Sequence, residues 1–257
     1  MGGIEIKTGE QLAKMRAAGH LLALTMQEVL KRIEPGAKDG DIDGFAEEFI
    51  RSHGALPAFK GYNGYPKTLC MSFNEQVVHG IPGNRRIKRG DLIGIDCGVI
   101  LDGYYSDMAR SVFVGGEPPR RVKKLMEVTE RALERGTQNM VEGKRLGDVS
   151  AAIQAEVEAH GFSVVRALVG HGIGTRMHEE PQVPNYGSPG TGPEIRNGMV
   201  FAIEPMVNMG RFAVKTLPDG WTIVTADKSL SCHFENTVAA TPDGPEILSR
   251  IQPEANL

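Results

Sequence analysis

The stretch RGDLIGIDCGVILDGYYSDMAR, residues 89–110, decides the fold that the sequence predicts. Its first half contains the short apolar run Leu92–Cys97, which is bounded by glycines and is typical of a buried strand. Asp102 and Gly103 are typical residues of a tight turn, and residues 104–113 predict a second strand that returns beside the first. We therefore expect a buried β-hairpin.

Two carboxylates interrupt this apolar hairpin. If Asp102 and Gly103 form a two-residue turn, Asp107 lies opposite Gly98, on the same face as Asp96. Diagonal neighbours on paired strands lie roughly 7–8 Å apart, whereas a three-residue loop would put the two acids on opposite faces. Buried carboxylates lose hydration and repel each other. They indicate either a bound cation or aspartates that support the turn or pair with a neighbouring arginine.

The composition is that of an ordinary globular protein. The chain has 257 residues, of which 40% are hydrophobic and 24% charged, with a net charge of −3. We therefore expect no general attraction to nucleic acid or to an anionic membrane. The apolar runs are far shorter than the ~20 residues of a membrane span. The three widely spaced cysteines indicate reduced thiols, and we expect a cytoplasmic location.

Helical spacing of apolar residues predicts four helices. The first follows a capping box at residues 8–11, and the second follows Asp41. A third begins near Arg120 after a pair of prolines, and a fourth runs from Asp148 to His160. Strand-like segments follow each pair of helices.

The second half of the sequence repeats the first. Residues 36–54 resemble residues 143–161 at an offset of 107, and residues 90–96 resemble residues 198–204 at an offset of 108. The repeat predicts an α+β fold of two similar halves, about 8–116 and 117–250, facing each other across a pseudo-twofold axis within a single domain, 1–257. It also aligns Glu204 with Asp96. Two buried acids that meet near the axis favour a bound cation.

Three further candidates lie in unusual contexts. His171 lies within the glycine-rich segment Val169–Gly174, Glu204 precedes a proline, and Glu235 precedes the apolar strand 237–240. Taken alone, each of them is more often a hydrogen-bonded core residue than a metal ligand. The glycine-rich segment lacks the Gly-Lys-Ser/Thr ending of a phosphate-binding loop, so we reject phosphate binding.

Taken together, these residues resemble the metal-ligand set of the methionine aminopeptidase family, type I, in its compact bacterial form. The ligand set is Asp96, Asp107, His171, Glu204 and Glu235. Several short motifs also match that family, namely Tyr62–Pro66, Asn74-Glu75, His79–Pro82, His171–Gly174, His178-Glu179, Ile203–Met206 and Trp221. The resemblance extends from about Ile6 to Leu248, which is almost the whole chain.

The resemblance implies the pita-bread fold with a central dinuclear metal site. Asp107 and Glu235 would bridge two divalent ions, Asp96 would bind one of them, and His171 and Glu204 would bind the other. Mixed oxygen and nitrogen ligands suit Co, Mn, Fe or Zn better than Ca. The family also implies a monovalent cation, bound here by the backbone of Asn74 and Ser231.

The family assigns roles to further residues. Glu204 would accept a proton from the attacking water, His178 would stabilise the oxyanion, and His79 would contact the scissile amide nitrogen. An apolar pocket would hold the substrate side chain, lined by Phe59, Tyr62, Tyr65, Cys70, His79, Met177, His178 and Trp221. From composition alone, the aromatic residues of this set would be core packing.

Four positions depart from the family pattern. Met177 replaces a common Phe, and Phe59 replaces a Cys of some relatives. Ala202 replaces a Thr of several relatives, which removes a hydroxyl near the ligands. His233 lies two residues before Glu235 on the same strand face. It would act either as a partner of the metal ligands or as an extra metal ligand.

The implied activity is removal of the N-terminal methionine from nascent proteins, with preference for a small second residue. The partners would be nascent polypeptide N-termini, with the ribosome as a further partner, and the protein would act as a monomer without direct nucleic-acid or membrane binding. Three alternatives remain open. They are an Xaa-Pro peptidase, a non-catalytic binding protein of the same fold, and a cysteine hydrolase that uses Cys70.

Overall fold

The predicted hairpin forms the spine of the computed structural model, which describes residues 3–251. Its strands are β4 (Leu92–Leu101) and β5 (Tyr104–Phe113). Asp102 and Gly103 join them with φ values of +49° and +79°, as a two-residue turn of the mirror-image type requires. Gly98 pairs with Asp107, which confirms the predicted register.

The hairpin lies within a curved sheet that has nine strands among the described residues, in the order β1-β4-β5-β14-β9-β7-β8, with β2 also paired to β4 and β15 to β14. The other strands of this sheet are β1 (Leu56–Pro57), β2 (Leu69–Phe73), β7 (Gly170–Gly172), β8 (Glu179–Val183), β9 (Val200–Ile203), β14 (Glu235–Thr241) and β15 (Gly244–Ile247). The pairing of β5 with β14 joins the two halves of the sequence.

Two small sheets flank this large one. One has the order β13-β10-β6 and the other β11-β12-β3. Their strands are β3 (Gln76–Val78), β6 (Ser163–Val164), β10 (Met206–Asn208), β11 (Val214–Thr216), β12 (Ile223–Thr225) and β13 (Ser231–His233). A short 3-10 helix, η1 (Tyr62–Gly64), precedes β2.

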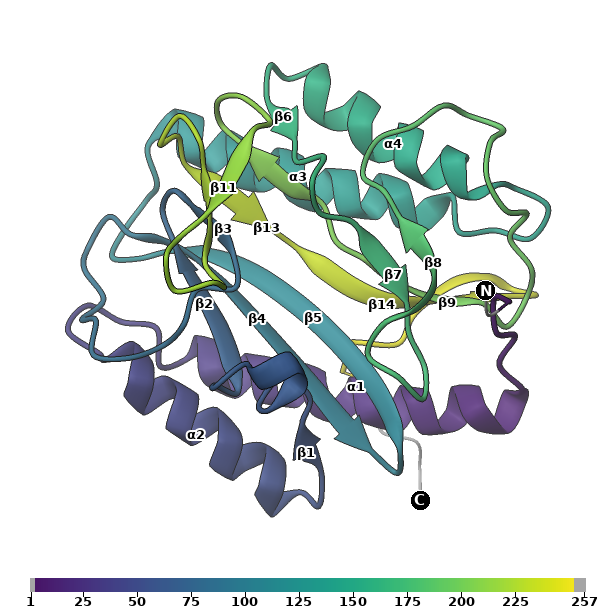
Figure 1. The fold of residues 1–257 in the computed structure, drawn as a ribbon, viewed down its shortest axis with the longest axis horizontal. Helices are drawn as coiled ribbons and strands as arrows, with labels where there is room; N and C mark the ends of the chain where they lie inside the picture. The colour runs from purple at the N-terminus through teal and green to yellow at the C-terminus, as the bar shows by residue number, and fades with distance from the viewer. Residues whose placement is uncertain (1–2, 252–257) are drawn as a thin grey trace.

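Helices cover the sheets from two sides. α1 (Gly9–Leu30) and α2 (Asp39–Ser52) lie together on one side, and α3 (Arg120–Gln138) and α4 (Leu146–Glu158) lie together on the other (Figure 1). The first pair packs on β2, β4 and β5, and the second pair packs mainly on β9, β10 and β14. The α+β architecture is thus as predicted, with one apolar core beneath each helix pair.

The helix starts refine the sequence prediction. The capping box of α1 is confirmed, because Thr8 and Gln11 bond to each other's backbone N–H groups. The prediction that the second helix follows Asp41 is wrong, since α2 begins at Asp39. Likewise α4 begins two residues before Asp148, whose carboxylate accepts the N–H of Arg145. Both predicted starting residues lie in the first helical turn, where the helix dipole favours negative charge.

The sequence repeat is also a repeat of backbone contacts. An isolated β-bridge joins Lys38 to Arg86, and another joins Arg145 to Glu194. These pairs are related by the two offsets found in the sequence. In each half, a residue of an equivalent loop therefore pairs with the residue just before the second helix of that half. The division of the chain into one domain with two halves stays a prediction.

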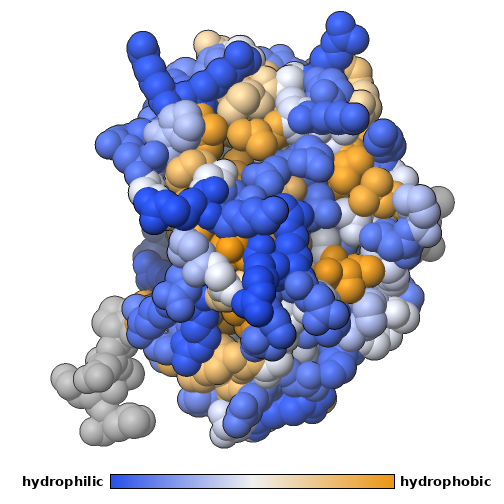
Figure 2. Space-filling view, turned by 90° about the vertical axis from the view of Figure 1, so that its left-hand side faces the viewer, coloured by the Kyte–Doolittle hydropathy of each residue, from blue (hydrophilic) through white to orange (hydrophobic). Residues whose placement is uncertain are grey.

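The surface is mixed in polarity. On the face in Figure 2, hydrophobic side chains form separate patches between hydrophilic ones. In residues 3–251, no helix has the length and apolar character needed to cross a bilayer. All three cysteines are buried and free.

The tight start of α2 predicts opposite effects for two glycine-to-alanine changes in one helix. A Cβ at Gly40 would lie 2.2 Å from the carbonyl oxygen of Gly83, whereas a Cβ at Gly44 would meet nothing within 4 Å. We expect Gly40→Ala to lower the free energy of unfolding by about 1–3 kcal/mol. Gly44→Ala should raise it by about 0.5–1 kcal/mol. Urea denaturation measures both, and equal effects would contradict this packing.

Candidate metal centre

The five predicted metal ligands come from five strands or strand ends that meet near the middle of the large sheet. Asp96 on β4 and Glu235 on β14 are each paired with Ala109 of β5, so their side chains lie on one face with a small residue between them. Asp107 lies two residues before Ala109 and shares that face. His171 is on β7, beside β9. The pairing of strands distant in sequence therefore brings the acids together.

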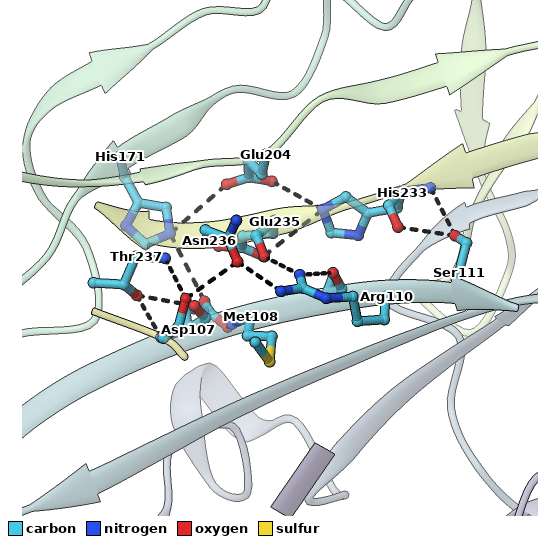
Figure 3. A network of polar contacts seen from close by, with 12 residues as sticks. Asp107, Met108, Arg110, Ser111, His171, Glu204, His233, Glu235, Asn236 and Thr237 are labelled. Atoms are coloured by element: carbon cyan, nitrogen blue, oxygen red, sulfur yellow. Dashed lines mark hydrogen bonds and ion pairs between the residues drawn. The ribbon is translucent and has the colours of Figure 1, made fainter. Parts of the chain in front are cut away.

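The distances between the side chains suit ligands of a common ion. The Nε2 atom of His171 lies 3.7 Å from Glu204 Oε1 and 4.0 Å from Asp107 Oδ2 (Figure 3). One ligand atom each of Asp107, His171 and Glu235 lies within 4.8 Å of the others. These distances are too long for hydrogen bonds. Two atoms that bind one ion at about 2.0–2.2 Å are themselves roughly 3–4 Å apart.

The acids are buried without enough hydrogen-bond donors. Asp96 Oδ1 and Glu235 Oε1 are buried and have no hydrogen-bond partner among residues 3–251. Burial raises the pKa of Asp96 to about 7. Burial, together with neighbouring carboxylates, raises the pKa values of Asp107, Glu204 and Glu235 well above their usual range. Unpaired oxygens in a cluster of four acids fit divalent cations, which would neutralise the cluster.

Arginine pairing, the alternative left open by the sequence, is not what holds these acids. Arg110 donates hydrogen bonds to the backbone carbonyls of Ala109 and Glu235 at 2.8 and 2.7 Å, and to Asn236 Oδ1 at 2.8 Å. Its guanidinium thus fastens β5 to β14. Among the described side chains, no arginine forms an ion pair with Asp96 or Asp107.

Outer contacts hold two of the candidate ligands in place. The Thr237 hydroxyl accepts the N–H of Asp107 and donates to its carbonyl, both at 2.9 Å. His171 Nδ1 donates to the carbonyl of Gly172 at 2.9 Å. Burial lowers the pKa of His171 to about 3, so the ring is neutral. The lone pair of its Nε2 therefore faces the acids, as a metal ligand requires.

A single cavity joins the acid cluster to the predicted substrate pocket. Its lining includes the five predicted metal ligands and also Phe59, Tyr62, Tyr65, Cys70, His79, Met177, His178 and Trp221. Every predicted pocket residue is therefore beside the cluster. The cavity also includes Asn63, which belongs to the Tyr62–Pro66 motif but is not among the predicted pocket residues. Its φ of +48° lies in the left-handed region, and an asparagine before a glycine was the signal that could have found it.

Ring packing and a hydrogen bond hold the aromatic wall of the pocket in place. The rings of Tyr65 and Trp221 pack edge to face with centroids 5.1 Å apart. The Tyr65 hydroxyl lies 2.9 Å from the carbonyl oxygen of Leu69. Burial raises the pKa of the nearby Cys70 thiol well above its usual value. A thiol that stays protonated disfavours the cysteine-hydrolase alternative.

Two histidines border the cavity from opposite halves of the sequence. His178 Nδ1 lies 2.6 Å from the Tyr62 hydroxyl, and its ring packs against His171 with centroids 4.3 Å apart. His79 follows β3 with a φ of +60°, a strained conformation that is often found at functional sites. Burial lowers the pKa of His79 to about 4, so this ring is also neutral.

The predicted monovalent-cation residues are adjacent but already bonded to each other. The Ser231 N–H donates to the backbone carbonyl of Asn74 at 2.9 Å. The Asn74 side chain accepts the N–H of Leu92 and donates to Asp91. Cation binding at this position stays a prediction.

The acid cluster predicts how the stability of the metal-free protein depends on pH. In the unfolded chain, carboxyl groups have pKa values of about 4 and histidines of about 6.5, and each group releases one proton. The pKa values of all four acids are raised in the fold. At neutral pH the folded chain therefore binds more protons than the unfolded chain, and its stability falls as pH rises. The histidines are then neutral in both states and do not oppose this trend.

We accordingly expect the Tm of the chelator-stripped protein to fall between about pH 7 and pH 8. Saturating Mn²⁺ should raise the Tm and remove this fall, because bound ions keep the carboxylates ionised. Circular dichroism melts with and without the ion measure both effects. A metal-free Tm that does not change with pH would contradict a cluster of buried acids.

Comparison with known proteins identifies the family. Residues 13–242 match the model of metallopeptidase family M24. Methionine aminopeptidase of Clostridium perfringens is 51% identical over 97% of this chain and 100% of its own length. Methionine aminopeptidase 1 of Bacillus subtilis is 51% identical over 95% of this chain and 98% of its own length.

Solved structures agree with these relatives. The crystal structure of methionine aminopeptidase from Rickettsia prowazekii has a TM-score of 0.94 and 42% identity, over 96% of this chain and 100% of that one. Prolidase from Pyrococcus furiosus shares the fold alone, with a TM-score of 0.76 and 22% identity, over 96% of this chain and 66% of that one. The pita-bread fold is thereby confirmed, and the chain belongs to metallopeptidase family M24, among the methionine aminopeptidases.

Proposed function

We propose that this protein is a metal-dependent aminopeptidase that removes the N-terminal methionine of peptides and nascent proteins, with preference for a small second residue. The observation that carries this proposal is the single cavity that joins an aromatic, apolar pocket to the buried acids. Thioether side chains make favourable contacts with aromatic ring edges. Relatives about half identical to this chain carry the name methionine aminopeptidase.

The proposed cofactor is a pair of divalent ions, Co, Mn, Fe or Zn, held by Asp96, Asp107, His171, Glu204 and Glu235. The family uses metal, and the unpaired oxygens of the cluster support ligation by these residues. When bound, such ions polarise a carbonyl group and increase the acidity of water. A monovalent cation at Asn74 and Ser231 is a further part of this proposal.

Glu204 is the proposed general base. Both glutamates line the cavity, but the side chain of Glu204 is 14% exposed and that of Glu235 only 2%. It would take one proton from the attacking water while the water oxygen bonds to the scissile carbonyl carbon. When the C–N bond breaks, Glu204 would return this proton to the leaving amine nitrogen. Water is consumed, and the products are free methionine and a shortened peptide.

His178 is the proposed oxyanion donor. Burial lowers its pKa, so the ring is neutral and carries one N–H. If the Tyr62 hydroxyl donates to Nδ1, the proton of the ring lies on Nε2. This nitrogen would then donate to the developing oxyanion. His79, also neutral and lining the cavity, would contact the scissile amide nitrogen.

The proposed setting is the cytoplasm, with nascent polypeptide N-termini as substrates and the ribosome as a partner. The protein would act as a monomer, without binding nucleic acid directly or a membrane. The net charge of −3 and the buried free thiols support this setting. On the face drawn in Figure 2 the hydrophobic patches are separate, so this face offers no large apolar surface to a second copy.

Cleavage of short peptides tests the function. We expect the chelator-stripped protein to be inactive, and Mn²⁺ or Co²⁺ to restore release of methionine from Met-Ala-Ser but hardly from Met-Lys-Ser. Mass spectrometry identifies the products. Cleavage of Xaa-Pro peptides instead would support an Xaa-Pro peptidase. Metal binding without any cleavage would support a non-catalytic binding protein.

Replacing Glu204 tests the assignment of the base. Glu204→Gln keeps the size and one ligand oxygen but cannot accept the proton, so kcat should fall by roughly 10²–10⁴-fold. Metal content, measured on the same sample, separates loss of the base from loss of the ions. Near-normal turnover would show that another group accepts the proton.

Replacing His178 tests the oxyanion role. His178→Ala should lower kcat by about 10²–10³-fold while KM and metal content change little. Tyr62→Phe is the matched variant, because it removes only the hydroxyl that bonds to His178 and should cause a smaller loss of kcat. A large loss of metal from His178→Ala would identify this residue as a ligand instead.

A further inference from the structure

His233 is a buried polar side chain that the proposed reaction does not use. It is the last residue of β13 and is only 3% exposed. Its Nε2 atom has no hydrogen-bond partner in the part of the chain that the structure describes. An unpaired nitrogen in such a place is costly unless something binds it.

The unpaired nitrogen faces the acid cluster. Nε2 of His233 lies 3.7 Å from Glu235 Oε2 and 3.9 Å from Glu204 Oε2. One ligand atom from each of these three residues lies within 4.8 Å of the others. Figure 3 shows the Glu204 carboxylate between two imidazole rings, with His171 beside one oxygen and His233 beside the other.

The spacing is that of a metal ligand. The distances from His233 exceed those of hydrogen bonds and match the 3.7 Å that separates His171 Nε2 from Glu204 Oε1. Two atoms that share an ion at about 2.0–2.2 Å are expected at roughly this separation. The group that contains His233 and the group that contains His171 share Glu235.

The backbone holds His233 in this position. Its N–H donates to the Ser111 hydroxyl at 3.0 Å, and the same hydroxyl donates to the His233 carbonyl at 2.8 Å. On the other side, His233 pairs with Met206 of β10. A ring fixed on a paired strand is preorganised, which is what a precise ligand needs.

We propose that His233 is a sixth metal-binding residue of this centre, with its Nε2 binding a divalent ion together with carboxylate oxygens of Glu204 and Glu235. The inference rests on the proposed metal binding of this chain. A second imidazole makes the site richer in nitrogen, which favours Zn, Co or Fe over Mg or Ca.

X-ray absorption of the zinc-loaded protein tests this assignment, because it counts imidazole ligands independently of activity. With two ions per chain, two ligand histidines give an average of one imidazole per ion. We expect this average to fall by half in His233→Gln. Isothermal calorimetry should show a loss of zinc affinity above the roughly 10–100-fold loss that removal of an outer contact causes.

Two variants are matched controls. His171→Gln removes the other predicted imidazole and should halve the same average. His160→Gln removes a histidine just after α4, whose Nδ1 contacts the backbone carbonyl and the carboxylate of Glu156. This change should alter neither the average number of imidazoles per ion nor the zinc affinity. Circular dichroism melts of the metal-free variants show whether each one folds.

The wild-type chain provides a test that needs no substitution. With ¹⁵N-labelled histidine, zinc should shift the Nε2 resonances of two histidines by the large amount typical of direct binding. Zinc binding with only one such shift would overturn the assignment of His233. A weaker affinity in His233→Gln with an unchanged imidazole count would do so too, since His233 would then only position Glu204. Failure to bind any divalent ion would instead overturn the proposed function.

Discussion

The constraint on which this structure depends is the burial of four carboxylates at one point of a β-sheet. Asp96, Asp107, Glu204 and Glu235 would repel one another and lose hydration if they were all ionised there. Burial raises their pKa values, and two of their oxygens have no hydrogen-bond partner among residues 3–251. Bound cations would neutralise these acids and stabilise the fold at neutral pH. The folding free energy of the rest of the chain therefore offsets the cost of holding these four acids together as a candidate metal site.

The residues around the four acids hold them in place beside the predicted substrate pocket. Hydrogen bonds of Arg110 and Thr237 join β5 to β14 and so hold the acids on these two strands close together. Small residues between them, such as Ala109, leave room at the centre. The aromatic pocket opens onto the same cavity. A peptide whose first side chain fills that pocket would have its first peptide bond beside the acids, which is the geometry of an aminopeptidase.

The two halves of the fold contribute unequally to this site. The first half supplies two aspartates and most of the aromatic wall, and the second half supplies the two glutamates and His171, a candidate ligand. The helix starts and loop bridges repeat between the halves, and so do the positions of Asp96 and Glu204, whereas the site histidines do not repeat. Repetition thus explains the scaffold and the meeting of Asp96 with Glu204. The histidines His79, His171 and His178 have no counterpart across the repeat, and in the proposed reaction they act beside the base Glu204.

The sequence by itself determined the hairpin register, because Asp102-Gly103 permits the positive φ values of a two-residue turn. It also determined the repeat and, through resemblance to a family, the candidate ligands. Only the tertiary structure decided that Arg110 bonds to carbonyls, that Asn63 lines the cavity and that His233 Nε2 faces Glu204. These contacts join residues of different strands and loops, some more than 100 positions apart. No local periodicity encodes them, because they depend on which strands pair and which way each side chain turns.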